Sequence, residues 1–579
     1  MASFSAGLTR RRRALFYCHT MKKDNVRIAI AQVNSTVGDL EGNSRKVNQY
    51  LNRLKGFGVD IVSFPELMLT GYPPEDLLLK PKFVSDSIDV LKSLARDVGD
   101  VVVVVGFVDK DKHGLYNAAA VLYQGKICGV YRKILLPNYG VFDEKRYFSA
   151  GSQAKIFRAG DLVFGVNICE DIWHEQGPLA RQAKLGAGLI VNINASPYHA
   201  GKIRMRQAIL QKQARAHKVF ISYVNLVGGQ DELVFDGQSM VISAQGRLIT
   251  RAEAFKEDLL ITDINPNVPG KKPAQATVIT QAFSLKERAP LPAREIKSLE
   301  PEAEVYQALV LGLHDYVVKN GFQKVVVGLS GGVDSALVAT LAADALGKEN
   351  VIAVFMPSHY SSRESQEDAR YLAENLGVKL IQVPIEQIYR LYLLVLEPHF
   401  MGSERDITEE NLQARIRGNL LMAFSNKFGW LVLTTGNKSE MSTGYATLYG
   451  DMAGGFAVIK DIPKVLVYRL CRYRNSLGFV IPDRVLTKAP TAELKPQQKD
   501  SDSLPVYDEL DPILKAYIEE DKGISQIVSL GYAPETVSKV IAMVDKSEYK
   551  RRQAPPGIKI TPKAFGKDRR MPITNKYRG

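Results

Sequence analysis

Cysteines are few in this sequence, and long hydrophobic runs are absent. The four cysteines, Cys18, Cys128, Cys169 and Cys471, are widely spaced and form no C-x-x-C pair. This pattern argues against both a disulfide framework and a structural zinc site. The longest apolar run, residues 101–106, is only as long as a strand, and the first twenty residues contain no apolar core of a secretory signal. We therefore expect a soluble protein of the reducing cytoplasm that does not enter a membrane.

Net positive charge is absent from the middle of the chain, although the formal net charge of the whole chain is +14. Residues 1–27 contain seven basic residues against one acidic residue, and residues 546–579 contain eleven against two. The residues between these ends therefore carry a net charge of −1. A nucleic-acid-binding protein would need basic residues on its folded surface, so we expect no nucleic-acid partner.

The two basic ends have separate interpretations. Residues 1–20 carry four consecutive arginines and no acid, in the manner of a transit peptide. Because residues 21–24 directly precede the first convincing strand, residues 26–31, we expect a disordered tail over residues 1–21 instead. The residues after Gly557 form either a solvated tail or a lid whose charge offsets the phosphates of a small molecule.

A chain of 579 residues has room for two large domains. Strand-like and helix-like segments alternate from Val26 to about Ile264, which indicates an α/β layer fold. Residues 265–300 contain five prolines among charges and little apolar pattern, as in an interdomain connection. We expect domains at residues 22–264 and 301–579, joined by a linker at residues 265–300.

A glycine-rich turn in the second half predicts a phosphate site. It follows the β-branched run of residues 325–327 and precedes the helix-forming residues 336–343. Glycines let a phosphate approach the backbone, and the N–H groups at a helix start favour an anion. The candidate residues are Gly328, Leu329, Ser330, Gly331, Gly332, Val333, Asp334 and Ser335. The alternative is a turn with a purely structural role.

The turn is not a Walker A loop, because the lysine of that loop is missing and Asp334 occupies a place suited to a Mg²⁺ ligand. Its S-G-G-x-D-S pattern resembles the loop of the ATP pyrophosphatase group. The resemblance implies that ATP is split into AMP and pyrophosphate to adenylate an oxygen. The strand and helix pattern of residues 351–383 adds a parallel, doubly wound sheet to this expectation.

Three residues of the first half lie at or just after predicted strand ends, where catalytic groups are common. They are Glu66 in S-F-P-E, Lys133 in Y-R-K-I-L-L-P, and Cys169 in G-V-N-I-C-E-D. Each alone is typical of a structural role: a surface carboxylate, a solvated charge and a core thiol. Their letters, order and spacing together resemble the Glu-Lys-Cys triad of the nitrilase superfamily.

The nitrilase resemblance implies an α-β-β-α sandwich and a role for each residue of the triad. Cys169 would be the nucleophile, Glu66 the base that takes its proton, and Lys133 the cation that stabilises the oxyanion. The flanking segments, residues 136–148 and 194–202, resemble the glutaminase branch that is fused to NAD synthetase. By that resemblance Tyr139, Ser196 and Lys202 would hold glutamine. Glu144 would be either a second catalytic carboxylate or an ion-pair partner of Lys145 or Arg146.

Later blocks of the second half resemble NAD synthetase more narrowly. They are residues 410–417, 431–440, 443–451, 462–464, 489–494 and 548–552. Carried over, the ATP contacts would be Thr435, Lys464 and Thr491; the deamido-NAD⁺ contacts would be Asn411, Arg415, Glu440 and Lys550; and the metal ligands would be Asp334 and Glu440. One departure is that the lysine of the shorter, ammonia-only enzymes is replaced here by Leu448, so that contact cannot be transferred.

The combined resemblance implies a glutamine-dependent NAD synthetase, a carbon–nitrogen ligase. One half would release ammonia from glutamine, and the other would use Mg²⁺ and ATP to amidate deamido-NAD⁺ to NAD⁺. The alternative is another amide-forming ATP pyrophosphatase with a different acceptor. The family forms homo-oligomers through its synthetase domains, so a homo-oligomer is expected.

Overall fold

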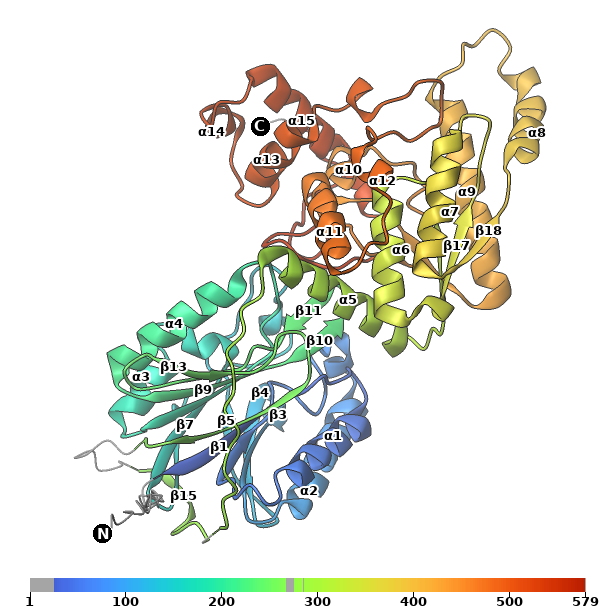
Figure 1. The fold of residues 1–579 in the computed structure, drawn as a ribbon. Helices are drawn as coiled ribbons and strands as arrows, with labels where there is room; N and C mark the ends of the chain where they lie inside the picture. The colour runs from blue at the N-terminus through green and yellow to red at the C-terminus, as the bar shows by residue number, and fades with distance from the viewer. Residues whose placement is uncertain (1–24, 267–274, 285, 578–579) are drawn as a thin grey trace, which may run out of the picture.

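The computed structural model describes residues 25–266, 275–284 and 286–577. The tail expected at residues 1–21 lies outside these ranges. Two bodies of α/β structure are visible, one from the N-terminal half and one from the C-terminal half (Figure 1). Within the described ranges, no helix is both long and apolar enough to cross a membrane.

The N-terminal half contains two mixed sheets. The first has the strand order β14 (Asp258–Ile264), β1 (Val26–Gln32), β2 (Ile61–Ser63), β3 (Val102–Asp111), β4 (Gly114–Tyr123) and β5 (Lys126–Arg132). The second has the order β13 (Leu248–Arg251), β12 (Met240–Ile242), β9 (Phe220–Asn225), β8 (Leu189–Asn194), β7 (Leu162–Ile168), β6 (Ile156–Ala159) and β15 (Thr277–Thr280). A hairpin of β10 (Val227–Gln230) and β11 (Leu233–Asp236) stands apart from both.

Helices cover the outer face of each sheet. The helices are α1 (Leu40–Arg53) and α2 (Pro81–Asp97) on the first sheet, and α3 (Pro178–Lys184) and α4 (Lys202–His217) on the second. On β3, Val102 and Val104 pack between the sheets, whereas Val103 and Val105 pack against the helices. Because both faces of the strand are buried, its sequence is continuously apolar rather than alternating. The predicted α-β-β-α sandwich is confirmed.

The segment expected as a linker is not uniform. Its residues Thr277–Thr280 form β15, which pairs in parallel with β6 at the edge of the second sheet. The remaining described residues of the segment have an extended or irregular backbone up to α5. A four-residue edge strand among prolines and charges has too short an apolar pattern to be recognised from the sequence.

The C-terminal half is built on one parallel sheet. Its strand order is β18 (Lys379–Gln382), β17 (Val351–Phe355), β16 (Val325–Gly328), β19 (Leu431–Thr434) and β20 (Phe456–Ala457). The order runs outward in both directions from β16, so the predicted doubly wound sheet is confirmed, and the crevice between β16 and β19 is its switch point. The phosphate loop follows β16 and therefore opens at this crevice.

The helices of the C-terminal half surround this sheet and extend beyond it (Figure 1). They are α5 (Pro301–Lys319), α6 (Val333–Leu346), α7 (Arg363–Leu376), α8 (Glu386–Leu396), α9 (Ile407–Phe428), α10 (Lys438–Thr443), α11 (Lys464–Leu477), α12 (Asp483–Thr487), α13 (Tyr507–Ile518), α14 (Ile524–Val528), α15 (Pro534–Lys546) and α16 (Glu548–Arg551). Helices α13 to α15 share a separate apolar core.

The two halves meet along α5 and the β10–β11 hairpin. A Cβ atom on Gly229 of the hairpin would lie 3.1 Å from the Cα atom of Gly312 in α5. Gly229 N donates to Asp315 Oδ2 at 2.7 Å, and Lys319 Nζ donates to Gly229 O at 2.8 Å. Backbone contact, a buried carboxylate and an ammonium group therefore join the halves at one place.

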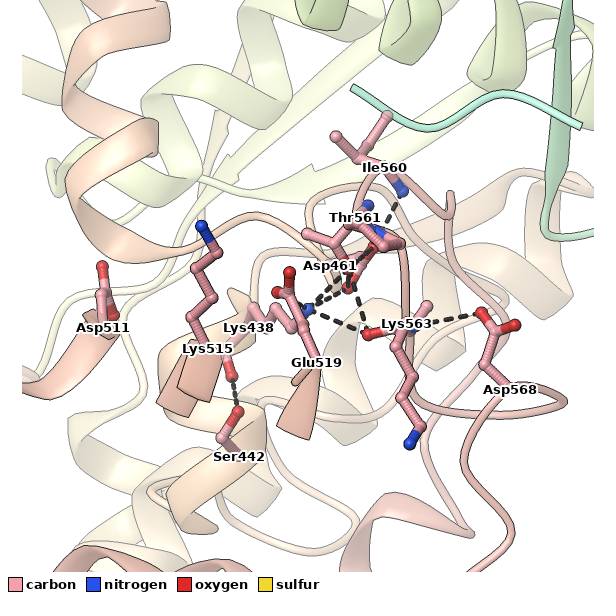
Figure 2. Close-up of polar contacts among 12 residues, drawn as sticks. Lys438, Ser442, Asp461, Asp511, Lys515, Glu519, Ile560, Thr561, Lys563 and Asp568 are labelled. Atoms are coloured by element: carbon pink, nitrogen blue, oxygen red, sulfur yellow. Dashed lines mark hydrogen bonds and ion pairs between the residues drawn. The ribbon is translucent and has the colours of Figure 1, made fainter. Parts of the chain in front are cut away.

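The basic C-terminus is not a solvated tail immediately after Gly557. Residues 558–561 are buried, and Ile560 N and Thr561 N donate to Asp461 Oδ2 at 2.8 and 2.7 Å (Figure 2). Ile560 O accepts from Ala200 N of the first half at 2.8 Å. The solvated-tail interpretation is wrong for this segment, because its two isoleucines are apolar and its backbone is paired with both halves.

Candidate functional site

Glu66 and Lys133 form a fully buried ion pair. Each residue follows a strand end, Glu66 after β2 and Lys133 after β5. Lys133 Nζ lies 2.7 Å from Glu66 Oε1. Asn117 Nδ2 donates to the same oxygen at 2.7 Å, and Ala195 N donates to Glu66 Oε2 at 2.8 Å. Three donors fix the orientation of the carboxylate, which suits a base that must meet its proton donor at a fixed angle.

Glu144 belongs to the same cluster. Lys133 Nζ lies 2.8 Å from Glu144 Oε1, and Tyr72 Oη donates to that oxygen at 3.1 Å. Burial raises the pKa of Glu144 to about 7, although Lys133 opposes this effect. Burial alone would lower the pKa of Lys133, but Glu144 and Glu66 outweigh it and hold that pKa well above its ordinary value. Lys133 is therefore a permanent cation, and the alternative pairing of Glu144 with Lys145 or Arg146 is not the one observed.

Cys169 completes this cluster at the end of β7. Its backbone φ is +42°, a left-handed conformation that non-glycine residues seldom adopt. The conformation breaks the strand direction at a functional position, where such strain is commonly found. Burial and then Glu66 raise the pKa of the thiol well above its ordinary value, whereas Lys133 lowers it. The thiol is therefore neutral at rest and requires a base to become a nucleophile.

Two of the residues predicted to hold glutamine, Lys202 and Tyr139, lie close enough to Cys169 to interact with it electrostatically. Ser196 N donates to Asn225 Oδ1 at 2.9 Å, and Lys202 Nζ donates to Pro197 O at 2.6 Å. Burial, with a further effect from Arg206, lowers the pKa of Lys202 to about 7. Lys202 forms no ion pair with a described carboxylate, so its charge is available to a ligand.

Tyr139 lies at the surface of this site, with 59% of its area exposed. Its Oη donates to Glu170 Oε2 at 2.9 Å, and Glu170 directly follows Cys169. A shallow pocket beside it is lined by Tyr72, Phe142 and Glu144, among others. Of the catalytic cluster, Glu144 lines this pocket.

The sequence did not identify Arg206 and Asp236, which support the glutamine side of the site. Their side chains form a fully buried ion pair, with Arg206 Nη1 3.0 Å from Asp236 Oδ2. Arg206 Nη2 donates to Ser196 Oγ at 3.4 Å. Arg206 lies on α4 and Asp236 on β11, thirty residues apart, so no local pattern connects them.

The phosphate loop has free donors at the start of α6. Gly331 has a φ of +80°, and a Cβ atom there would lie 2.4 Å from Ser365 O, so only glycine fits. Ser330 N donates to Ser335 Oγ at 3.2 Å, which closes the loop on itself. Among the residues that the structure describes, no side chain caps the N-terminus of α6, and its N–H groups are therefore open to an anion.

This loop forms one wall of a pocket of about 280 Å³. Three residues that were predicted to contact ATP line this pocket. Thr435 follows β19, Lys464 begins α11, and Thr491 lies in the loop after α12. Lys464 Nζ is bonded to Asp334 Oδ2 and lies 3.4 Å from Glu440 Oε1. The two carboxylates thus face one point, which a cation already occupies in the form of the ammonium group.

A magnesium ion fits this pair. Mg²⁺ commonly takes one or two carboxylates and completes its shell with substrate phosphates and water. Asn437 Nδ2 donates to Asp334 Oδ1 at 3.0 Å and so orients the first carboxylate. Within the described residues, no group of three or more His, Cys, Asp or Glu side chains is placed to hold a metal alone. The phosphates of a substrate would therefore be needed to complete the shell.

The other residues predicted to contact deamido-NAD⁺ do not line the pocket, but they hold its wall. Asn411 Oδ1 accepts from Thr447 Oγ1 at 2.6 Å, and Arg415 Nε donates to Leu448 O at 3.2 Å. Lys550 Nζ donates to Ala446 O at 2.9 Å. All three contacts are with the loop between α10 and β20, where the sequence departs from the shorter enzymes.

Comparisons with known proteins match both halves. A model of carbon–nitrogen hydrolases matches residues 27–271, and a model of NAD synthases matches residues 305–554. The chain is 51% identical to the glutamine-dependent NAD(+) synthetase of Thermotoga maritima, over 96% of this chain and 99% of the relative. It is 48% identical to that of Aquifex aeolicus, over 95% of this chain and 99% of the relative.

Solved structures of similar proteins have the same two-part architecture. The glutamine-dependent NAD+ synthetase of Acinetobacter baumannii, solved with ADP, has 44% identity and a TM-score of 0.74 and covers 95% of this chain and 99% of its own. The corresponding protein of Cytophaga hutchinsonii has 24% identity and a TM-score of 0.79, over 95% of this chain and 98% of its own, and supports the fold alone.

Proposed function

Because the chain belongs to the glutamine-dependent NAD(+) synthetases, we propose that its two sites divide the reaction between them. The cluster around Cys169 releases ammonia from glutamine. The pocket around Asp334 adenylates deamido-NAD⁺ with ATP and transfers the ammonia to it. The observation that carries this proposal is the presence, in one chain, of a buried Glu66–Lys133–Glu144 cluster beside Cys169 and an uncapped phosphate loop at the sheet's switch point.

In the first site, Glu66 takes the proton of the Cys169 thiol as the sulfur attacks the amide carbon of glutamine. The amide oxygen becomes an oxyanion, which Lys133 stabilises as a nearby cation. Ammonia leaves with the proton that Glu66 held, and a thioester remains. Water then attacks the thioester, with Glu66 as base, and glutamate leaves while the thiol is restored. Glu144 is hydrogen-bonded to the Lys133 ammonium group and helps to keep it protonated throughout the reaction.

Glutamine binds between the triad and the residues Tyr139, Ser196 and Lys202. The unpaired, buried ammonium of Lys202 is suited to the carboxylate of the amino acid. Arg206, which is paired with Asp236, donates to Ser196 and holds it in place. Tyr139, which is exposed and bonded to Glu170, borders the entrance.

In the second site, a carboxylate oxygen of deamido-NAD⁺ attacks the α-phosphorus of ATP, and pyrophosphate leaves. Residues 328–335 bind the phosphates through backbone N–H groups, and Thr435, Lys464 and Thr491 line the rest of the ATP pocket. Ammonia then attacks the activated carbonyl carbon, AMP leaves, and NAD⁺ forms. AMP is needed because a free carboxylate is a poor acceptor.

Asp334 and Glu440 would hold Mg²⁺, which supplies positive charge against the phosphate oxygens. Asn437 would keep the Asp334 carboxylate in position for this role. Asn411, Arg415, Glu440 and Lys550 are our proposed contacts for deamido-NAD⁺. Three of them fix the loop of residues 444–451, so they also shape the wall on which the acceptor would lie.

The acceptor is tested by giving the purified protein ammonium, ATP and Mg²⁺ with deamido-NAD⁺, nicotinate mononucleotide or a pyrimidine nucleotide in turn. We expect NAD⁺, AMP and pyrophosphate in equal amounts from deamido-NAD⁺ and no comparable turnover of the others. Faster turnover of another acceptor would establish the alternative, a different amide-forming ATP pyrophosphatase.

The pKa of Lys202 predicts a pH dependence for the first site. Since this pKa is about 7, the protonated fraction falls as the pH rises above 7. The kcat/KM for glutamine hydrolysis should therefore fall about tenfold per pH unit on the alkaline side. A Lys202→Arg variant remains charged, so its alkaline limb should move upward by more than one pH unit. The assignment fails if both proteins lose activity at the same pH.

We propose a homo-oligomer that assembles through α8 and the start of α9. Five apolar side chains on α8, at the start of α9 and in the segment that joins them are between 59% and 80% exposed: Leu391, Leu394, Val395, Met401 and Ile407. Exposed apolar surface of this kind commonly marks a protein interface. Helix α8 projects at the edge of the C-terminal body (Figure 1), so a second copy could cover it without disturbing the sheet.

Light scattering tests this interface. The double variant Leu394→Glu, Val395→Glu should have a lower native mass than the wild type, because the charges would be buried without partners. Leu477→Glu, at an exposed position on α11 away from α8, is the matched control and should keep the wild-type mass. A wild type that is monomeric, or a double variant with unchanged mass, would disprove the interface.

The proposed boundaries remain residues 22–264 for the glutaminase domain, 265–300 for the linker and 301–579 for the synthetase domain. We also propose a cytoplasmic location. It is supported by the cysteines, which are few, widely spaced and without a C-x-x-C pair.

A further inference from the structure

The basic side chains that line the ATP pocket differ in whether a carboxylate of the protein pairs with them. Three basic side chains line it, namely Arg417, Lys464 and Lys488. Lys464 forms ion pairs with the two carboxylates of the metal site. Lys488 Nζ lies 2.7 Å from Glu493 Oε1. Two of the three cations are therefore balanced by carboxylates of the protein itself.

Arg417 has no such partner. Its one hydrogen bond within the described residues runs from Nε to Met356 O, at 3.0 Å, and no described carboxylate lies within ion-pair distance. Burial lowers the pKa of Arg417 to about 10, although Glu493 opposes this effect. The group is still charged at neutral pH. A guanidinium carries five N–H donors, and four of them remain for a ligand.

Arg417 lines the same pocket as the phosphate loop. Met356, which accepts its hydrogen bond, directly follows β17, and Gly328 ends β16. Leu421, one turn further along α9, packs against the same place, because a Cβ atom on Gly328 would lie 3.3 Å from Leu421 Cδ1. The guanidinium therefore lies near the carboxyl ends of the two central strands, where nucleotides bind in doubly wound sheets.

The helix that carries Arg417 is fixed on both sides of the pocket. A Cβ atom on Gly418 would lie 2.7 Å from Gly450 O, so α9 packs directly on the loop of residues 444–451. One turn earlier, Gln413 Nε2 donates to Leu494 O of the opposite wall at 2.9 Å. Arg417 is therefore held in a preorganised position, and little entropy is lost when it meets a ligand.

We propose that Arg417 binds the phosphate groups of ATP, as a contact separate from both the loop N–H groups and the Asp334–Glu440 pair. The proposal rests on the proposed use of this pocket for ATP. A buried guanidinium without a carboxylate is suited to phosphate oxygens, which accept two parallel hydrogen bonds from its planar fork. ATP brings several negative charges into the pocket, and Arg417 is the lining cation that forms no ion pair with a carboxylate of the described residues.

Calorimetric titration of the full-length protein tests the contact, with ATP, AMP, pyrophosphate and adenosine as separate probes in the presence of Mg²⁺. Arg417→Gln should weaken ATP roughly 10- to 100-fold. It should also weaken AMP, pyrophosphate or both, and leave adenosine unchanged. Arg417→Lys keeps the charge but not the fork, so it should bind ATP with intermediate affinity. Lys427→Gln loses an exposed charge roughly 15 Å further along the same helix and is the matched control.

Three outcomes would overturn the proposal. These are unchanged ATP affinity in Arg417→Gln, weaker binding of adenosine to the same extent as ATP, or an equal loss in Lys427→Gln. Thermal unfolding of each variant separates a local loss from misfolding, and Arg417→Lys provides the result if the glutamine variant does not fold. Because the titrations need no acceptor, a wild type that binds ATP but makes no NAD⁺ would contradict the proposed acceptor and not the role of Arg417.

Discussion

Cys169→Ala is expected to abolish NAD⁺ synthesis from glutamine and to preserve synthesis from ammonium. Without the thiol no thioester can form, so glutamine hydrolysis should fall by roughly 10⁴-fold or more, the scale of losing a covalent nucleophile. The proposed second site lies in the other half of the chain, and we expect it to accept ammonia from solution. The measurement is NAD⁺ formed from ATP and deamido-NAD⁺, with either glutamine or ammonium as nitrogen source.

A matched control for this substitution is available in Cys128→Ala. Cys128 lies on β5, is partly exposed, and donates only a weak hydrogen bond to Lys126 O at 3.9 Å. This variant should keep both activities. Loss of both activities in Cys169→Ala, or of neither, would contradict the division of the reaction between two sites.

Asp334→Asn is expected to abolish NAD⁺ synthesis from either nitrogen source and to preserve glutamine hydrolysis. The substitution removes one of the two carboxylates that face Lys464, and with it the proposed hold on the metal. Synthesis should fall at least roughly 100-fold with glutamine and with ammonium alike. Glutamine hydrolysis should continue, because Cys169 and the Glu66–Lys133–Glu144 cluster all come from the first half. The measurement is glutamate and NAD⁺ released from the same reaction.

Asp508→Asn is the control for this loss of charge. Asp508 is exposed in the first turn of α13 and does not line the pocket. Its activities should equal those of the wild type. If Asp334→Asn made NAD⁺ from ammonium at an undiminished rate, the assignment of the second site would be wrong. A variant that also lost glutamine hydrolysis would indicate that the first site depends on the second.

The family and the two-part α/β fold predicted from the sequence are both confirmed. The predictions that succeeded rest on residues whose structural role is decided by their immediate neighbours in the sequence. Gly331 is an example, because its left-handed conformation and its contact with Ser365 O allow no side chain. The triad residues are another, because each follows a strand end in a short recognisable block. Their catalytic roles remain predictions.

The supporting residues could not be predicted, because they depend on contacts between distant segments. Tyr72 meets Glu144 across 72 positions, and Asn117 meets Glu66 across 51. Arg417 stands in a recognised block, but only the assembled pocket shows that no carboxylate in the described part of the chain pairs with it. Tertiary contacts of this kind leave no periodic pattern in the sequence.

One of the two interpretations of the C-terminus, the solvated tail, was wrong for residues 558–561 for a related reason. Its basic residues dominate the composition, so residues 558–561 were open to interpretation as solvated. The two isoleucines among them are buried between the halves, and Asp461 binds the backbone around them. The composition of a segment gives only its average polarity, so it does not show which of its residues are buried.

The glycine contact between the halves bears on how this protein can be re-engineered. Gly229 and Gly312 let a hairpin and a helix approach backbone to backbone, and Asp315 and Lys319 bond to that same hairpin. A chimera that joins this ammonia-releasing half to a foreign synthetase would need glycine at the corresponding helix position. The unit to exchange is therefore not a domain cut at the linker. It is the ammonia-releasing domain together with the face of α5 that contacts its hairpin.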